Sequence, residues 1–138
     1  MEAELEVAAA FDAFVDAHSP RLPADAADSL QRIKAALARV LPRVQSAHAR
    51  AALSTEDVFF LTQAVSRYLP DAVEPFLALP PDRIEQPLAG HSKAPHELLI
   101  DQLAIVEREF ARIEESLFGA EADRLARNRT LLERRRSD

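Results

Sequence analysis

The stretch His96–Phe118, HELLIDQLAIVEREFARIEESLF, carries the clearest structural signal in the chain. Its large apolar residues recur at alternating steps of four and three: Leu99, Leu103, Val106, Phe110, Ile113 and Leu117. This spacing puts them on one side of an α-helix and is the heptad pattern of helices that pack as a bundle or coiled coil. At about 1.5 Å per residue, the helix would span roughly 35 Å. We expect Gly119 to end it as a left-handed C-cap.

A second heptad seam lies in the segment 26–51. Its members follow one another at steps of three and four: Leu30, Ile33, Leu37, Val40, Val44, Ala47 and Ala51. We expect Asp25 to be the N-cap of this helix, because its carboxylate can accept a free backbone N–H. Pro42 lies inside the pattern and removes one helical hydrogen bond. Because the seam keeps its phase after Pro42, we expect a kink there and not the end of the helix.

Shorter apolar stripes predict the remaining helices. One covers residues 2–18. Another begins after Ser54, the first residue of the capping-box sequence STED, and reaches Leu79. Pro70 is expected to bend or restart that helix. A last helix, 121–135, has its leucines among arginines, and we expect it to fray.

The chain as a whole is therefore expected to be all-α. We predict a single domain, residues 1–138, folded as a bundle of four to five helices with proline kinks. Residues 80–95 hold four of the nine prolines and are expected to form a long extended connection, while 120–138 form a basic C-terminal end. The chain has no cysteine, which excludes disulfides, thiolate metal sites and cysteine nucleophiles.

The charge of the chain is unevenly distributed. Its net charge is −6, of which residues 1–30 contribute −6 and residues 120–138 contribute +2. An acidic protein is not attracted to phosphate backbones over long distances, so nucleic acid is disfavoured as a partner. The two oppositely charged ends could attract each other, within one chain or between chains.

The sequence shows no membrane span and no secretory signal. No stretch approaches the roughly 18 uncharged apolar residues that a membrane span requires. The segment Met1–Glu6 is acidic where a secretory signal would be basic, so we expect a cytoplasmic location.

Several blocks in the second half of the chain resemble a helical module of bacterial proteins. They are Arg67–Asp71 (RYLPD), Phe76–Pro80 (FLALP), the pairs Leu98-Leu99 and Gln102-Leu103, and Asn128–Glu133 (NRTLLE). The module is similar to one in XpaC-like and toxic-anion-resistance-associated proteins. This resemblance implies a helical accessory domain and supplies no catalytic residues.

No set of residues forms a recognisable catalytic or metal-binding pattern. His18 and His48 lie on or beside apolar stripes, and His91 and His96 lie in the proline-rich region without the spacing of a helical ligand pair. No serine has a glycine elbow or a recognisable base beside it. We therefore expect a non-enzymatic protein without a metal or cofactor.

The acidic residues of the segment 96–118 also lie away from its heptad seam. Glu107 with Glu114, and Glu109 with Glu115, are expected on a solvent-exposed face. A di-metal bundle would need such acids inside the core, contributed by several helices.

An excess of large apolar residues around 58–69 and 98–110 indicates either central helices or a binding face. The candidate interface residues are Phe59, Phe60, Tyr68, Phe76, Leu98, Leu99, Ile100, Leu103 and Ile105. The leading hypothesis is a protein–protein interaction or assembly module that binds a partner helix or forms a homodimer. Candidates for electrostatic contact are Arg134, Arg135 and Arg136.

Two alternatives remain open. One is a bundle that binds a small molecule or metal, related to anion stress, in which the connection 80–95 with His91 and His96 acts as a lid or a ligand source. The other, a minor one, is nucleic-acid binding through the arginine-rich C-terminus.

Overall fold

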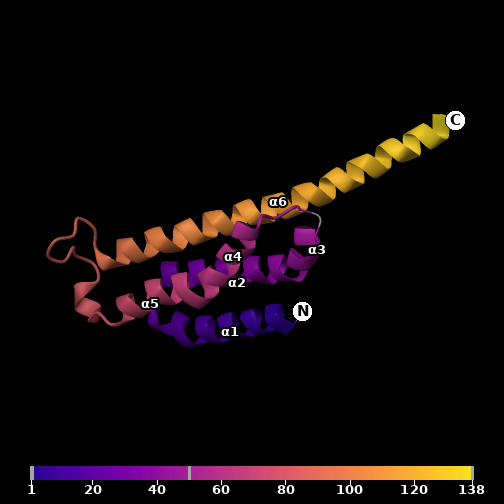
Figure 1. Ribbon diagram of the computed structural model, residues 1–138. Coiled ribbons are helices and arrows are strands. Elements are labelled where there is room, and N and C mark those ends of the chain that lie inside the picture. Colours follow the sequence, from indigo (N-terminus) through magenta and orange to yellow (C-terminus); the bar gives the residue numbers. More distant parts are fainter. Residues whose placement is uncertain (1, 50, 138) are drawn as a thin grey trace.

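The computed structural model describes residues 2–49 and 51–137, and these form helices and loops without a strand. Figure 1 shows the helices side by side, with the last helix extending far beyond the others. The α-helices are α1 (Glu2–His18), α2 (Ala24–Val40), α3 (Val44–Ala49), α4 (Thr55–Gln63), α5 (Leu69–Leu77) and α6 (Pro95–Ser137). Short 3-10 turns cover Ser19–Arg21, Leu41–Arg43 and Pro81–Arg83, and Ala64–Tyr68 is a π-helix. The all-α helical fold predicted from the sequence is confirmed.

The first half of α6 packs along the other helices, and α2 lies against it (Figure 1). The two helices run in the same direction, because Arg32 pairs with Glu107 and Arg39 pairs with Glu114. Between the helices lies one apolar core. Its largest fully buried side chains are Phe11, Val15, Leu30, Ile33, Val40, Leu69, Val73, Leu99, Leu103, Phe110 and Ile113. The heptad seam of α6 therefore faces the bundle, as a stripe of this kind must.

Proline disturbs the second helical segment at the predicted place, but the α-helix ends there, where the sequence predicted a kink in a continuing helix. Pro42 lies in a 3-10 turn that ends α2 and leads directly into α3, and Val44 beyond it is still buried. The prediction that Ala51 is the last member of this seam is wrong, because Ala51 lies after the end of α3 in a turn with φ 59°. The side chain of Ala47 lies outside the described residues.

The start of α2 also differs from the prediction. Pro23 holds the N-cap position and α2 begins at Ala24, so Asp25 is in the first turn and is not the cap. Its carboxylate accepts a hydrogen bond from the Ala26 N–H at 2.8 Å. Ser54, in contrast, caps α4 as predicted, accepting the Asp57 N–H at 3.0 Å.

The chain remains helical from α4 to α5 but changes its hydrogen-bond pattern before Pro70. Proline lacks an N–H and its ring crowds the carbonyl four residues earlier, so it disturbs the hydrogen bonds of the helical turn before it. The Leu69 N–H instead bonds to the Ala64 carbonyl, five residues back, which defines the π-helix. The predicted restart at Pro70 thus takes the form of a π-helical turn followed by α5, which ends at Leu77.

The C-cap prediction at Gly119 is wrong. The segments 96–118 and 121–135 belong to one helix, α6, of 43 residues, which is about 65 Å long. A glycine inside a helix costs only about 1 kcal/mol relative to alanine, and the residues after it, Ala120-Glu121-Ala122, are good helix formers. Without a proline or a capping partner there, the helix continues.

Candidate functional site

The predicted interface residues fall into three groups in the structure. Phe76, Leu99 and Leu103 are core residues, exposed by 7%, 2% and 0%, so their assignment to a surface is corrected. The reason is that the seam of α6 and the apolar face of α5 pack inside the bundle. Phe60, Leu98 and Ile100 are half-buried at its edge. The exposed members are Phe59, Tyr68 and Ile105.

Two of these exposed residues border a shallow apolar groove between the π-helix and α6. The Phe60 ring lines it, with its centroid 5.7 Å from that of Tyr68 and 6.1 Å from that of Phe110. The groove has a volume of about 350 Å³ and is lined by Phe60, Tyr68, Leu69, Asp71, Ala72, Gln102, Ile105 and Val106. Tyr68 and Ile105 are thus the exposed members of the predicted interface at this groove, and Phe59, which is 60% exposed, does not line it.

The more prominent surface is the projecting segment, which we define as residues 118–136 of α6. Leu117 is the last buried residue, and every residue from 121 to 136 is exposed. Figure 1 shows this part of α6 leaving the bundle. Its large apolar side chains are exposed to an unusual degree: Phe118 by 42%, Leu125 by 74%, Leu131 by 61% and Leu132 by 60%.

The sequence contained a signal for this surface that the interface prediction missed. Phe118, Ala122, Leu125, Arg129, Leu132 and Arg136 follow at steps of four and three. They form a stripe along the projecting segment, although two positions are arginines. Arg134 and Arg135, the other two predicted electrostatic residues, are exposed beside its end.

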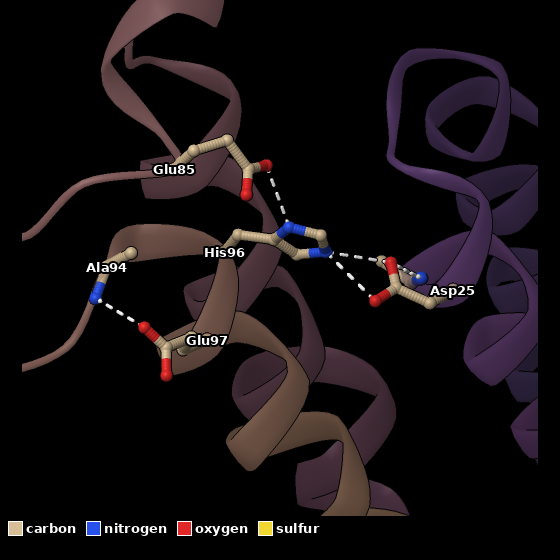
Figure 2. Close-up of polar contacts among 6 residues, drawn as sticks. Asp25, Glu85, Ala94, His96 and Glu97 are labelled. Atoms are coloured by element: carbon tan, nitrogen blue, oxygen red, sulfur yellow. Dashed lines mark hydrogen bonds and ion pairs between the residues drawn. The ribbon is translucent and has the colours of Figure 1, made fainter.

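The connection 80–95 is fastened at one point by His96 (Figure 2). The His96 Nε2 lies 2.8 Å and 3.0 Å from the two carboxylate oxygens of Asp25, and its Nδ1 lies 2.9 Å from Glu85 Oε1. The His96 backbone N–H also bonds to the Ile84 carbonyl at 2.9 Å. The start of α2, the connection and the start of α6 are thereby joined.

In this His96 cluster, the two carboxylates beside His96 shift the pKa values of His96 and Asp25. A neutral imidazole has one N–H to donate, whereas two carboxylates here face the two ring nitrogens. The hydrogen bond to Asp25, with a further one to Glu85, raises the pKa of His96 above 6.5 against the opposing effect of burial. The same bond lowers the pKa of Asp25 below 3.8. The cluster is therefore most stable as an imidazolium between carboxylates.

The start of α6 is shaped by local sequence. Pro95 is its first residue, where the missing N–H is harmless. Glu97 accepts the Ala94 N–H at 3.2 Å, which resembles the returning half of a capping box (Figure 2). These contacts fix the direction of His96.

The His96 cluster does not have the arrangement of a metal site. Its two carboxylates approach opposite nitrogens of the ring, so the three groups do not converge on one point (Figure 2). Across the described ranges, no group of three or more His, Asp or Glu residues could hold a metal ion. His91, the other histidine of this region, is exposed and lines a pocket instead.

That pocket lies between α5, the connection and α6. It has a volume of about 270 Å³ and is lined by Asp71, Ala72, Pro75, Phe76, Leu79, Leu88, His91, Lys93, Pro95, Leu98, Leu99 and Gln102. Its walls are mostly apolar, and Lys93 at its rim is paired with Asp101 at 2.6 Å.

Two acidic residues predicted on a solvent-exposed face are partly buried ion-pair partners. Glu114 is 13% exposed and accepts two hydrogen bonds from Arg39, at 2.9 Å and 3.1 Å. Glu107 is 28% exposed and accepts bonds from Ser29 at 2.7 Å and Arg32 at 3.0 Å. They hold α2 against α6, which a single sequence could not reveal because the partners are about 75 residues away.

Of the other two histidines, the structure describes the side chain of His18. His18 stacks on Phe14, with ring centroids 4.4 Å apart, and its Nδ1 is buried without a hydrogen-bond partner. It is a boundary residue of the core, in line with the sequence prediction. The side chain of His48 lies outside the described residues.

Comparison with known proteins gives no relative for this arrangement. No family model matches the chain, and no curated protein or solved structure shows significant similarity to it. The resemblance to XpaC-like and toxic-anion-resistance-associated proteins stays a prediction. Among the described residues, no helix is both long and apolar enough to cross a membrane.

Proposed function

We propose that this chain is a non-enzymatic protein–protein interaction module, and that the projecting segment of α6 is its contact element. The observation that carries the proposal is the exposure of Leu125 and Leu132, by 74% and 60%, on a helix that has left its bundle. Burying such leucines against a partner would contribute roughly 1.5–3 kcal/mol each.

The energetics of an isolated helix support this proposal. Helices of this length without tertiary packing are marginally stable in water. The interactions within the projecting segment are short-range pairs such as Glu121–Arg124 and Arg129–Glu133, which contribute a few tenths of a kcal/mol each. A partner that covers the leucine stripe would supply the missing stabilisation.

The experiment that tests this function is cross-linking in the cells that produce the protein, read by mass spectrometry. Wild type and the control Leu131→Glu should give the same cross-linked proteins, because Leu131 lies off the stripe, about 100° around the helix from Leu132 and about 120° from Leu125. The double variant Leu125→Glu/Leu132→Glu should lose them. Identical cross-links for all three proteins would refute the proposal.

A second candidate function, binding of a small apolar molecule, is favoured by the pocket beside His91. Its volume of about 270 Å³ and apolar walls suit a short apolar group, with Lys93 at the rim. A fragment screen by thermal shift would detect it. The replacement Leu88→Trp should fill the pocket and abolish any shift; shifts that persist in that variant would place binding elsewhere.

A further inference from the structure

We propose that the partner of the projecting segment is the same segment of a second copy of this chain, packed against it in antiparallel orientation. This inference rests on the proposed function and identifies the partner. It comes from three features of residues 118–136: the order of side chains along the stripe, the positions of their charges, and the direction in which the stripe faces.

The stripe is complementary to itself when it is reversed. In an antiparallel pair, the two positions of a heptad stripe alternate across the interface. Ala122 then lies opposite Leu132 of the second copy, and Leu125 lies opposite Arg129 of the second copy. Phe118 lies opposite Arg136 of the second copy. Each layer thus joins a large side chain to a small one or to an arginine, whose apolar stem can cover a leucine or a ring while its charge stays in water.

The parallel arrangement of the same two helices is disfavoured by charge. It would place Arg129 against Arg129 of the second copy, and Arg136 against Arg136 of the second copy. Like charges facing each other at core positions are destabilising. The antiparallel arrangement separates these arginines and brings Glu121 beside Arg135 of the second copy, twice by symmetry.

The charge of the whole chain also favours the antiparallel pair. Residues 120–138 carry +2, and the chain carries −6, so residues 1–119 carry −8. In the antiparallel pair, each basic tip reaches the end of the other bundle from which α6 leaves, and α1 begins at that same end (Figure 1). Exposed Glu6 of α1 would attract the tip.

The stripe is oriented so that a second helix can approach it. The face of α6 that packs on its own bundle ends at Leu117, and the stripe begins at Phe118. One residue turns a helix by about 100°. The stripe therefore points roughly a quarter turn away from the bundle. Arg43 of the bundle lies over the Phe118 ring, 5.9 Å from its centroid, and beyond this contact a second helix can lie along Ala122–Arg136 over about 21 Å.

Association is tested by sedimentation equilibrium over micromolar concentrations. Wild type and Leu131→Glu should form dimers. Leu125→Glu and Leu132→Glu should each raise the dissociation constant on the order of tenfold or more, because each leucine is buried twice in the dimer. All four proteins should have the same circular dichroism signal from the bundle, since these residues are outside its core. A dimer that is insensitive to Leu125→Glu and Leu132→Glu would overturn the inference.

Orientation is tested by disulfide formation, because the chain has no cysteine of its own. We expect Ala122→Cys and Leu132→Cys, made in copies of different mass, to give a mixed disulfide and little homodimeric disulfide. Homodimeric disulfides of each variant alone would show a parallel pair and overturn the antiparallel arrangement.

The failure of this inference and that of the proposed function give different results. If wild type is a monomer throughout the micromolar range, the second copy is not the partner. Cross-links in cells that are lost in Leu125→Glu/Leu132→Glu but kept in Leu131→Glu would then identify another protein as the partner and preserve the proposed function. A monomer without such cross-links would refute both.

Discussion

At the scale of single residues, His96 has the most specific surroundings in the protein. Its ring lies between Asp25 of α2 and Glu85 of the connection, and its own side chain is 22% exposed. Both hydrogen bonds require the imidazolium for full strength. The cluster therefore makes the stability of the bundle depend on pH in a direction that can be worked out.

We expect the stabilisation by the His96 cluster to be largest between about pH 3.8 and pH 6.5. Because the pKa of His96 is raised above 6.5, its contribution is complete below pH 6.5 and is lost as the pH rises through the folded-state pKa. Because the pKa of Asp25 is lowered below 3.8, its contribution is lost as the pH falls through that lower value. Urea unfolding of wild type and His96→Gln across this range measures the difference.

The size of this effect is about 1 kcal/mol or less, because the Asp25 and Glu85 side chains are 56% and 65% exposed and solvent screens them. His91→Gln is the matched control, since His91 lies in the same connection and is exposed. A stability difference between wild type and His96→Gln that stays constant from pH 4 to pH 9 would contradict this account.

Two leucines of α6 should respond very differently to the same replacement. Leu103 is fully buried and Leu125 is 74% exposed. Leu103→Ala removes packed methyl groups and leaves a cavity, so we expect the free energy of unfolding to fall by about 2–5 kcal/mol. Leu125→Ala should change it by less than about 0.5 kcal/mol in dilute solution. Chemical denaturation tests both, and a similar loss in the two variants would show that the segment is packed on the bundle.

At the scale of elements, the continuity of α6 across Gly119 determines whether a contact surface exists. An alanine Cβ at this position would meet nothing within 4 Å. We therefore expect Gly119→Ala to stabilise the helix by about 1 kcal/mol and to raise the temperature at which the projecting segment loses its helical structure. Circular dichroism melting measures it, and a lower midpoint would mean that Gly119 is needed as a break.

Gly90 provides the contrast for this experiment. An added Cβ would also meet nothing there, but the φ of Gly90 is +85°, which L-residues rarely adopt. Gly90→Ala should therefore destabilise the connection by about 1–2 kcal/mol. If Gly119→Ala raises stability and Gly90→Ala lowers it, the difference comes from backbone conformation, because an added Cβ has room at both positions.

At the scale of the whole molecule, the bundle and the projecting segment are expected to be energetically separate. No described side chain beyond Leu117 is buried. Removal of residues 120–138 should therefore leave the thermal midpoint of the bundle within about 2–4 °C of wild type, equivalent to less than about 1 kcal/mol. Calorimetry of the truncated chain in dilute solution measures this. A much lower midpoint would show that the segment folds back on its own bundle.

Much of this architecture could be predicted from the sequence, because heptad spacing is a local property. The stripe from Leu99 to Leu117 specified a helix and its apolar face. Ser54 indicated the N-cap of α4, and Pro42 and Pro70 indicated where the helical hydrogen bonds are interrupted. The prediction of a C-cap at Gly119 was wrong because a glycine within a helix costs little free energy. The helix-forming residues Ala120 and Ala122 outweigh that cost.

The candidate site was less predictable, because its parts come together only in three dimensions. Asp25 and His96 are 71 positions apart, and Arg39 and Glu114 are 75 apart. Nothing in the local sequence around either carboxylate indicates its partner. Likewise, Leu99 and Leu125 both lie on apolar stripes of one helix, and the spacing alone does not tell which is covered.

The sequence by itself therefore determined that the chain is helical, where most helices lie and which face of each is apolar, since these properties follow from the periodicity of neighbouring residues. The tertiary structure decided which apolar faces are buried and which charged groups meet. The physical reason is that burial depends on the length of the neighbouring elements. The other helices cover α6 only as far as Leu117, and the stripe that continues beyond them is left exposed to a partner.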